Sequence, residues 1–404
     1  MPINQEALVE PGRVLAALKA SARVEPESGI IQIFNYGRDR EGIIPLWVGQ
    51  GDLPTPKFIY DAAVKSLEDG ETFYTYQRGL PPLRQALAEY HEGLYGKPFD
   101  AENFFVTGSG MQAMQTAIQA VAGEGDKIIL PSPAWPNYPA PLRLAGVRPV
   151  EVPMQFANRA WSLDLDRLFD AVTDKTRAIC INTPSNPLGW VMKADQILAI
   201  RDFCRARGIW IVADEVYARF YFGPGADTGT LPPSFHDVCD PEEQFLMVNT
   251  FSKNWAMTGW RVGWLQAPRA MGQVVENLIQ YNTSGTAAFM QRACITALEQ
   301  GDELLAQQVA QARAGRDIVC SALKDLPGVH FAEPDGAFYL FLSVDGAGDA
   351  VNFAQRMIDD IAVGVAPGTA FGPGGEDFMR LCFARSASSL QEAMDRLTGW
   401  LKTR

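Results

Sequence analysis

The chain has 404 residues, enough for about two to three domains, and its 47% hydrophobic and 20% charged residues are ordinary for a folded protein. The net charge of −12, with no basic run, argues against nucleic acid or an anionic membrane as a partner. The six cysteines show no paired spacing, which argues against a disulfide framework or a zinc site and fits a reducing cytoplasm. Only three histidines are present, which argues against a histidine triad or a metal cluster. No hydrophobic run approaches about 20 residues, so we expect neither a spanning helix nor a signal peptide.

Residues 1–45 are expected to form an amphipathic N-terminal arm. Its possible apolar stripe consists of Leu8, Val14, Leu15 and Leu18. From 46 to 290, strand-like and helix-like patterns alternate, which is typical of a doubly wound α/β sheet. Residues 291–404 begin with a helical pattern to Leu323. Strand-like patterns follow at 329–332, 338–342 and 379–384.

An anion site is predicted where a strand at 103–107 meets a helix at 111–122. Gly108, Ser109 and Gly110 form the tight turn between them, so backbone N–H groups at the helix start are free to bind a phosphate. The same residues also fit a dinucleotide fingerprint, which requires an acid at the end of the next strand. Asp126 stands before that strand instead of after it, which disfavours the dinucleotide interpretation.

Polar side chains follow three buried strands further along the chain. Two of these strands, at 178–182 and 209–213, flank a helix at 194–207, which predicts a parallel crossover. Asn186, Asp214 and Lys253 each fall just past the end of a strand. In an open parallel sheet these ends share one edge, so we expect the three side chains to meet there.

Lys253 follows the apolar strand at 245–248. A lysine in an apolar pocket beside another cation loses its proton more easily and becomes nucleophilic, and Arg261 can be that cation. The expected apolar walls are Trp255, Trp260 and Trp264. For a lysine taken at random, a solvated surface position is the usual alternative.

An amide, a carboxylate, a phenol and a lysine together suit a pyridine aldehyde that bears a ring oxygen. Asp214 would keep the ring nitrogen protonated, while Asn186 and Tyr217 would contact the ring oxygen. Taken singly, these residues also fit a turn, a helix cap and a core aromatic. Their common placement favours the site.

Arg380 lies in a segment at 377–384 that alternates like a strand. Its small neighbours Cys382 and Ala384 would leave the planar guanidinium free to bind a carboxylate. An exposed strand arginine fits the pattern equally well.

In this order, from about Leu46 to the C-terminus, the motifs resemble the fold-type I pyridoxal-phosphate enzymes of the class I/II aminotransferase family. The resemblance implies a pyridoxal 5′-phosphate cofactor attached to Lys253 as a Schiff base. It implies an α/β fold with a large, doubly wound, mostly parallel sheet domain at 46–290. A smaller α/β domain at 291–404 would be joined by the N-terminal region 1–45.

The resemblance also implies roles for single residues. The matching cofactor-binding residues are Gly110, Met111, Gln112 and Ser252 with Arg261 at the phosphate, Trp135 stacked on the ring, and Asn186, Asp214 and Tyr217 at the ring atoms. Tyr74 matches a tyrosine that reaches the phosphate of the neighbouring subunit, which implies a homodimer with shared active sites. Arg380 matches the arginine for the substrate α-carboxylate, with Gly49 and Asn186 beside it.

Departures from the family pattern concern specificity. Met111 stands where one subgroup of aspartate aminotransferases has a lysine for the distal carboxylate, which argues against that mode of recognition. An arginine from the partner subunit stays possible. Leu188 and Tyr76 also depart from the usual residues, so the pocket rim is expected to have its own shape. Its candidate lining residues, which fit the protein core equally well, are Phe34, Tyr36, Trp190, Phe338 and Tyr339.

The function implied is transamination between an L-amino acid and a 2-oxo acid, with Lys253 as the general base and acid. A β-elimination (C–S) lyase or a cyclopropane-forming synthase on the same fold shares most of these residues and stays open. A cofactor-binding transcription regulator is disfavoured, because the region before the match is too short and too little basic for a DNA-binding domain.

Overall fold

The computed structural model describes residues 11–403. A seven-stranded sheet has the order β2-β10-β9-β8-β7-β3-β4. Its strands are β2 (Phe104–Thr107), β3 (Lys127–Ser132), β4 (Arg148–Pro153), β7 (Thr176–Asn182), β8 (Trp210–Asp214), β9 (Phe245–Thr250) and β10 (Gly263–Gln266). β10 runs antiparallel to both of its neighbours, and the remaining neighbouring pairs are parallel. This confirms the predicted mostly parallel sheet.

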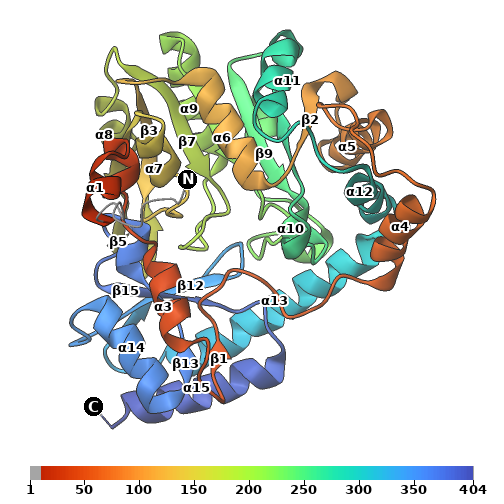
Figure 1. Ribbon diagram of the computed structural model, residues 1–404. Helices are drawn as coiled ribbons and strands as arrows, with labels where there is room; N and C mark the ends of the chain where they lie inside the picture. The colour runs from red at the N-terminus through yellow and green to blue at the C-terminus, as the bar shows by residue number, and fades with distance from the viewer. Residues whose placement is uncertain (1–10, 404) are drawn as a thin grey trace, which may run out of the picture.

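Helices cover both faces of this sheet (Figure 1). On one face, Ile179 and Ile211 share a core with α9 (Ala194–Arg207) and α8 (Leu165–Asp170). On the other face, Cys180 and Val212 pack with α6 (Gly110–Val121), α7 (Pro139–Leu144) and α11 (Gly272–Gln280). Because successive residues of β7 and β8 are buried on opposite faces, these strands read as unbroken apolar runs. The doubly wound arrangement is confirmed.

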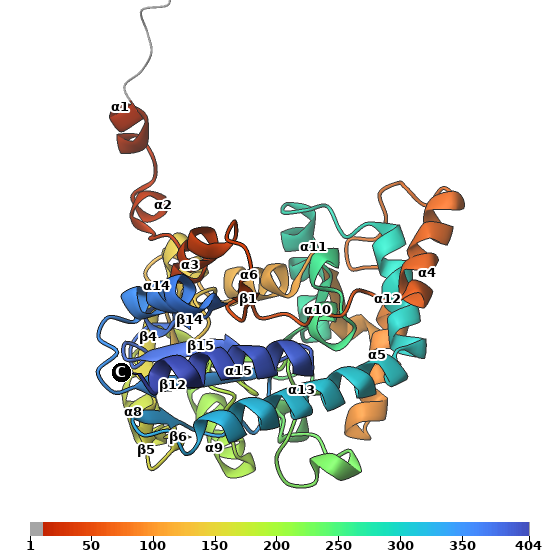
Figure 2. The same cartoon turned by 90° about the horizontal axis from the view of Figure 1, so that it is seen from below.

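A second, four-stranded sheet is antiparallel and has the order β11-β12-β15-β14. Its strands are β11 (Val329–Phe331), β12 (Tyr339–Val344), β14 (Ala366–Pro367) and β15 (Phe378–Cys382). α13 (Asp302–Leu323), α14 (Ala350–Ile361) and α15 (Ala387–Leu401) pack with this sheet (Figure 2). β1 (Ile44–Pro45) pairs in parallel with β13 (Val363–Gly364), and α3 (Gly29–Gly37) packs on α14, so part of the N-terminal region joins this smaller unit.

The helical pattern predicted for 291–323 is divided into two helices. α12 (Ala288–Gln300) ends before Gly301, where a Cβ would lie 2.2 Å from the Ala297 carbonyl oxygen, and α13 follows. α12 packs on α4 (Lys57–Glu68) and α5 (Pro81–Tyr95) at the β2 edge of the large sheet. The domain boundary predicted at 290/291 therefore falls inside α12.

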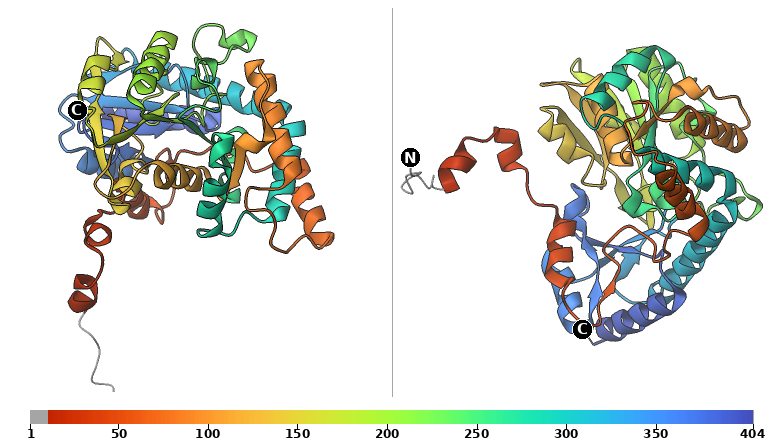
Figure 3. Two further views of the ribbon diagram at one scale, coloured as in Figure 1. Left: turned by 90° about the horizontal axis from the view of Figure 1, so that it is seen from above. Right: turned by 45° about the vertical axis from the view of Figure 1, so that its right-hand side comes forward.

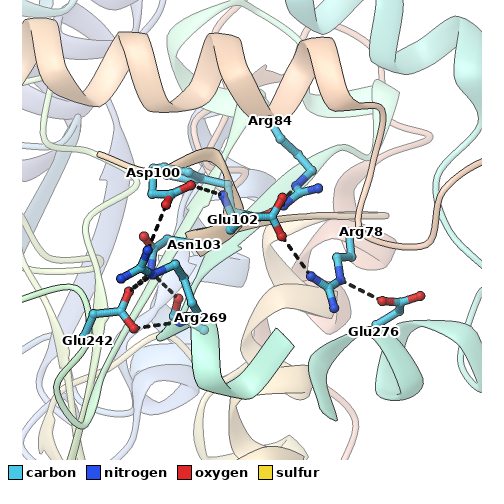
Figure 4. A network of polar contacts seen from close by, with 10 residues as sticks. Arg78, Arg84, Asp100, Glu102, Asn103, Glu242, Arg269 and Glu276 are labelled. Atoms are coloured by element: carbon cyan, nitrogen blue, oxygen red, sulfur yellow. Dashed lines mark hydrogen bonds and ion pairs between the residues drawn. The ribbon is translucent and has the colours of Figure 1, made fainter. Parts of the chain in front are cut away.

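The loop before α5 is held to the large unit by a network of ion pairs (Figure 4). Arg78 contacts Glu276 at 2.7 Å and Glu102 at 3.1 Å, and Glu102 also contacts Arg84 at 2.7 Å. Nearby, Arg269 bridges Asp100 and Glu242, and Glu242 accepts a hydrogen bond from Asn103.

The N-terminal arm projects from the body of the molecule (Figure 3). α1 (Pro11–Ala16) and α2 (Ala20–Val24) form it, and Val14, Leu15 and Leu18 are about half exposed, at 52%, 54% and 49%. Leu8, the first residue of the predicted stripe, lies outside the described residues. A small hairpin of β5 (Gln155–Ala157) and β6 (Ala160–Ser162) completes the strands. Within residues 11–403, no helix has both the length and the apolar character needed to cross a bilayer.

Candidate active site

The carboxyl edge of the large sheet and the smaller sheet border one open cavity of about 380 Å³. The ends of three neighbouring strands coincide at this edge. Asn182 of β7 is paired with Asp214 of β8, and Asp214 is paired with Val248 of β9. The predicted site residues that line the cavity are Gly49, Gly110, Met111, Trp135, Asn186, Asp214, Tyr217, Ser252, Lys253, Arg261 and Arg380. Residues spread over some 330 positions of sequence thus face one space.

Lys253 lies on the short helix α10 (Phe251–Asn254), directly after β9. Thr250 caps this helix by accepting a hydrogen bond from the Ser252 N–H at 3.2 Å, which fixes the turn that carries the lysine. The Lys253 Nζ donates to the Gly49 carbonyl oxygen at 2.7 Å. Although the side chain is only half-buried, desolvation of the amine lowers its pKa to about 8, and the charges of Arg380 and Arg261 also lower it.

The walls beside Lys253 are not the predicted tryptophans. Its Nζ lies 5.7 Å from the centre of the Tyr217 ring and 5.9 Å from that of Phe338. Trp255 and Trp264 instead pack into the core with Phe251. The Trp260 indole donates to the Thr55 hydroxyl at 2.9 Å, away from this cavity. The prediction of tryptophan walls is therefore wrong, because all three rings find other partners.

Asp214 ends β8 and is buried, with 3% of its surface exposed. One carboxylate oxygen accepts a hydrogen bond from the Tyr138 hydroxyl at 2.6 Å, and the other accepts one from the Val216 N–H at 3.2 Å. Burial raises the pKa of Asp214 to about 6, while both hydrogen bonds act in the lowering direction. Tyr138 was missed by the sequence interpretation, and its only signal was its place three residues after Trp135.

Arg380 is a buried side chain, with 2% of its surface exposed, which rules out the alternative of an exposed strand arginine. Its Nη1 donates to Asn186 Oδ1 at 3.0 Å, and its Nη2 donates to the Trp47 carbonyl oxygen. The guanidinium lies over the rings of Tyr339 and Phe371, at 4.7 and 5.0 Å. These contacts hold the planar guanidinium at the cavity wall.

Tyr217, Tyr339 and Gly49 are in close contact at the cavity wall. The two phenol oxygens lie 2.7 Å apart, in hydrogen-bond contact, and burial raises the pKa of Tyr217 well above its ordinary value. A Cβ on Gly49 would lie only 2.1 Å from the Tyr339 hydroxyl, so a larger residue at this position would displace the Tyr339 ring. Tyr339, one of the candidate rim residues, therefore lines the cavity and orients Tyr217.

The predicted anion-binding side of the cavity lies where α6 begins. Ser109 caps α6 by accepting from the Gln112 N–H at 3.0 Å. Gly263 of β10 lets the strand approach the helix start, because a Cβ there would meet the Gly110 nitrogen at 2.5 Å. Arg261 has a left-handed backbone, with φ of 55°, and its Nη1 donates to the Thr258 carbonyl oxygen at 2.6 Å. An exposed cation thus stands beside a helix N-terminus at the cavity.

Some predicted site residues do not reach this cavity. The Gln112 side-chain amide donates to the Thr283 hydroxyl at 2.8 Å. Gln112 therefore supports the loop that contains Thr283 and does not line the cavity. Tyr74 is 92% exposed in the loop before α5. Tyr36 donates to Asp359 at 2.9 Å and does not line the cavity, so its place in the substrate pocket stays a prediction.

The other rim candidates also divide between core and cavity. Phe34 packs edge-on against Trp47, with ring centres 6.0 Å apart, while Trp190 lines a separate hollow and Phe338 lies beside Lys253. From α3, Ile30 and Ile31 face the large cavity. The helix therefore presents its first turn to the cavity, and the later residues Phe34 and Tyr36 contact the smaller unit.

Comparisons with known proteins agree with this geometry. The family model "Aminotransferase class I and II" matches residues 41–397. An aspartate aminotransferase of Pyrococcus horikoshii is 33% identical over 373 residues, 92% of this chain and 93% of that protein. An aromatic-amino-acid aminotransferase of Thermococcus litoralis is 34% identical over 383 residues, 93% of this chain and 96% of that protein.

A solved structure shows the same likeness in three dimensions. The aspartate aminotransferase of Thermotoga maritima matches with a TM-score of 0.88 and 31% identity, covering 95% of this chain and 100% of that one. Sequence and architecture agree over nearly the whole length. The chain belongs to the class I and II aminotransferases and has their fold type I architecture.

Proposed function

We propose that this aminotransferase uses pyridoxal 5′-phosphate, held by Lys253, to move an amino group from an L-amino acid to a 2-oxo acid. The observation that supports this most is the meeting of the Lys253 amine, the buried Asp214 and the buried Arg380 at one cavity. The first is a nucleophile with a lowered pKa, the second an anion, and the third a carboxylate receptor.

The residues present fit a phosphorylated pyridine aldehyde. The start of α6, with Gly110 and Met111, and the side chains of Ser252 and Arg261 offer donors and positive charge for a phosphate. Asp214 is a buried carboxylate whose hydrogen bonds from Tyr138 and Val216 leave it suited to pair with a protonated ring nitrogen. Trp135 lines the same space and can cover the face of a flat ring.

When bound, pyridoxal phosphate supplies an electron-accepting ring that stabilises negative charge at the α-carbon of the substrate. Arg380 binds the α-carboxylate and, together with Asn186, orients the amino acid. With the cofactor bound, the Lys253 amine would serve as the general base that takes the α-proton of the substrate and as the general acid that gives it back. Tyr217 would contact the ring oxygen of the bound cofactor, and its hydrogen-bond contact with Tyr339 holds it in position.

We also propose a homodimer in which Tyr74 reaches the phosphate of the partner's site. Support comes from the exposure of large aromatic side chains near this loop, which on a monomer would stay in water. The residues concerned are Phe73, Tyr74, Tyr76 and Tyr281, with 83%, 92%, 62% and 85% of their surface exposed. A cytoplasmic location is proposed because all six cysteines are free and buried.

The function is tested with purified holoprotein and single L-amino acids, without a 2-oxo acid. Transamination predicts that the absorbance of the bound aldehyde is replaced by that of the aminated cofactor, and that the matching 2-oxo acid appears. A lyase would instead release ammonia and pyruvate from cysteine conjugates on every turnover. Lys253→Ala is the control. The assigned role is supported if the wild-type protein shows the spectral change and this variant does not.

A further inference from the structure

We propose that the amino donor carries an uncharged, apolar side chain, and that Ile30 and Ile31 of α3 form part of its binding site. This inference rests on the proposed aminotransferase function and adds the chemical class of substrate to it. Beyond the groups assigned to cofactor and α-carboxylate, the cavity wall includes the apolar side chains of Ile30, Ile31 and Val48. Its polar members, such as Gln50, Asn137 and Thr258, are uncharged.

The first turn of α3 lies beside the proposed carboxylate receptor. A Cβ on Gly29 would be 3.0 Å from the Ala370 Cβ, and Ile30 packs in the same hydrophobic cluster as Ala370 and Phe371. The Phe371 ring lies 5.0 Å from the Arg380 guanidinium carbon. Ile30, Ile31 and Arg380 border the same cavity, so the two isoleucines are within the space open to the side chain of a substrate held by Arg380. Ile31 is 47% exposed, so a bound apolar side chain would cover its surface.

Among the residues that the structure describes, every charged residue that lines the cavity already has a proposed role toward the cofactor or the α-carboxylate. They are Asp214 for the ring nitrogen, Lys253 for the amine, Arg261 for the phosphate and Arg380 for the α-carboxylate. A second carboxylate on the substrate would find no further cation in this wall. Met111 presents a thioether close to the phosphate site, which suits an apolar side chain better than an anion.

The proposed dimer does not supply the missing cation through the loop that carries Tyr74. Residues 72–75 and 283–287 border one hollow and contain neither lysine nor arginine. Arg78, the next cation along this loop, is paired with Glu102 and Glu276 and only 24% of its side chain is exposed (Figure 4). Its charge is therefore already balanced within its own chain.

A carboxylate moved from water into an apolar wall loses hydration without gaining an ion pair, whereas an apolar side chain gains from leaving water. Hydrophobic pockets distinguish side chains that differ by a single methylene by about 10- to 200-fold. We expect leucine, methionine or phenylalanine to exceed aspartate and glutamate by about 100-fold or more in kcat/KM, because an unpaired charge costs more than a methylene.

The first experiment uses the wild-type holoprotein and needs no variant. Conversion of the cofactor by leucine, methionine, phenylalanine, aspartate and glutamate is followed by stopped-flow absorbance, one donor at a time. Dissociation constants of two unreactive analogues, 4-methylpentanoate and succinate, are measured in parallel by calorimetry. The proposal expects faster conversion by the apolar donors and tighter binding of 4-methylpentanoate.

The second experiment adds a cation to the wall. Ile31→Lys places an ammonium where a distal carboxylate would lie, so the ratio of aspartate to leucine activity should rise about tenfold or more. Gln32→Lys is the matched control, because Gln32 is an exposed neighbour on the same helix and does not line the cavity. In 0.15 M salt this control should leave the ratio within about twofold of wild type, because Gln32 does not line the cavity and salt screens exposed charges.

Equal or faster conversion of aspartate or glutamate by the wild-type protein would overturn the substrate class while leaving the aminotransferase function intact. If no amino acid converts the cofactor, the proposed function fails instead. Even then the two analogues decide the nature of the pocket, and tighter binding of succinate would overturn the inference.

Discussion

Tyr138 and Asp214, 76 residues apart in sequence, are joined by a hydrogen bond of 2.6 Å from the phenol to a carboxylate oxygen. Both side chains are buried. Burial raises the pKa of Asp214 to about 6, and the hydrogen bond opposes this rise because it stabilises the anion. The phenol therefore helps to keep Asp214 charged, which is the state its proposed role requires.

Replacing this phenol should shift the acidic limb of the pH profile. In Tyr138→Phe the carboxylate loses a donor, so its pKa should rise and Asp214 should become neutral at a higher pH. We expect kcat/KM to fall about tenfold near pH 6 and less at pH 8, since one hydrogen bond to a charged group contributes about 1.5–3 kcal/mol. A pH–rate profile checks this, with the surface variant Tyr60→Phe as control. An unshifted acidic limb would contradict the role given to Tyr138.

Cofactor loading should depend on the protonation of Lys253. Only the neutral amine attacks an aldehyde, and burial lowers the pKa of Lys253 to about 8. The rate of attachment of added pyridoxal phosphate to the apoprotein should therefore rise with pH to a midpoint near 8, well below the value of about 10.4 for an ordinary lysine. Borohydride reduction followed by peptide mass spectrometry measures attachment at this residue. A midpoint near 10 would show that the amine is not desolvated.

Arg380→Lys should weaken binding of both substrates, although the charge is kept. The guanidinium is held by Asn186 Oδ1 and the Trp47 carbonyl and lies over two rings, which a lysine cannot reproduce. We expect kcat/KM for amino acids to fall by about 100-fold, equivalent to about 3 kcal/mol. A simple alkylamine, which lacks the carboxylate, is the matched control substrate. Its slow conversion should be the same in both proteins, and an equal loss with the amine would indicate general damage instead.

A methyl group at position 49 should disturb Tyr339 and, through it, Tyr217. The Cβ of Gly49→Ala would lie 2.1 Å from the Tyr339 hydroxyl and 2.9 Å from its ring carbon Cζ. We expect this variant to lower the melting temperature and kcat together, with a stability loss of about 1–3 kcal/mol from overpacking. Adding Tyr339→Phe removes the nearest atom and should restore part of the stability. Additive losses in the double variant would show that the two residues do not interact.

Local patterns predicted the large sheet because its strands are buried on both faces and end in polar residues. Asp214 and Lys253 could be placed at one edge from this alone, since the ends of parallel strands must coincide. Tyr138 could not be assigned to Asp214, because their contact depends on how the loop after β3 folds over β8. No periodicity in the sequence records such a contact.

The substrate side of the cavity was less predictable for a related reason. α3 has hydrophobic residues on more than one face, and Ile33 and Phe34 pack into the smaller unit. Which turn faces the cavity depends on how the helix docks on α14 and Ala370. The sequence alone therefore indicates Tyr36, which lies one to two turns beyond Ile30 and Ile31. The role of the three tryptophans near Lys253 could not be predicted for the same reason, because aromatic residues fill a core as readily as they line a site.

His236 lies in a buried aromatic cluster outside the active site. Its ring is 4.5 Å from Tyr95, 5.2 Å from Phe99 and 5.5 Å from His91, measured between ring centres. Neither ring nitrogen has a hydrogen-bond partner among the described residues. Burial lowers the pKa of His236 well below its ordinary value, so the folded protein holds this ring neutral.

His236→Phe should therefore stabilise the protein, and more so in acid. The unfolded chain binds a proton at His236 below about pH 6.5 and the folded chain does not, so wild-type stability falls as the pH decreases. Phenylalanine removes this loss, and the gain in unfolding free energy should be about 2 kcal/mol larger at pH 5 than at pH 8. Urea unfolding of both proteins at the two pH values measures it, and His91 contributes equally to both. A gain independent of pH would mean that His236 also binds a proton in the folded protein, with a hydrogen-bond acceptor as its partner.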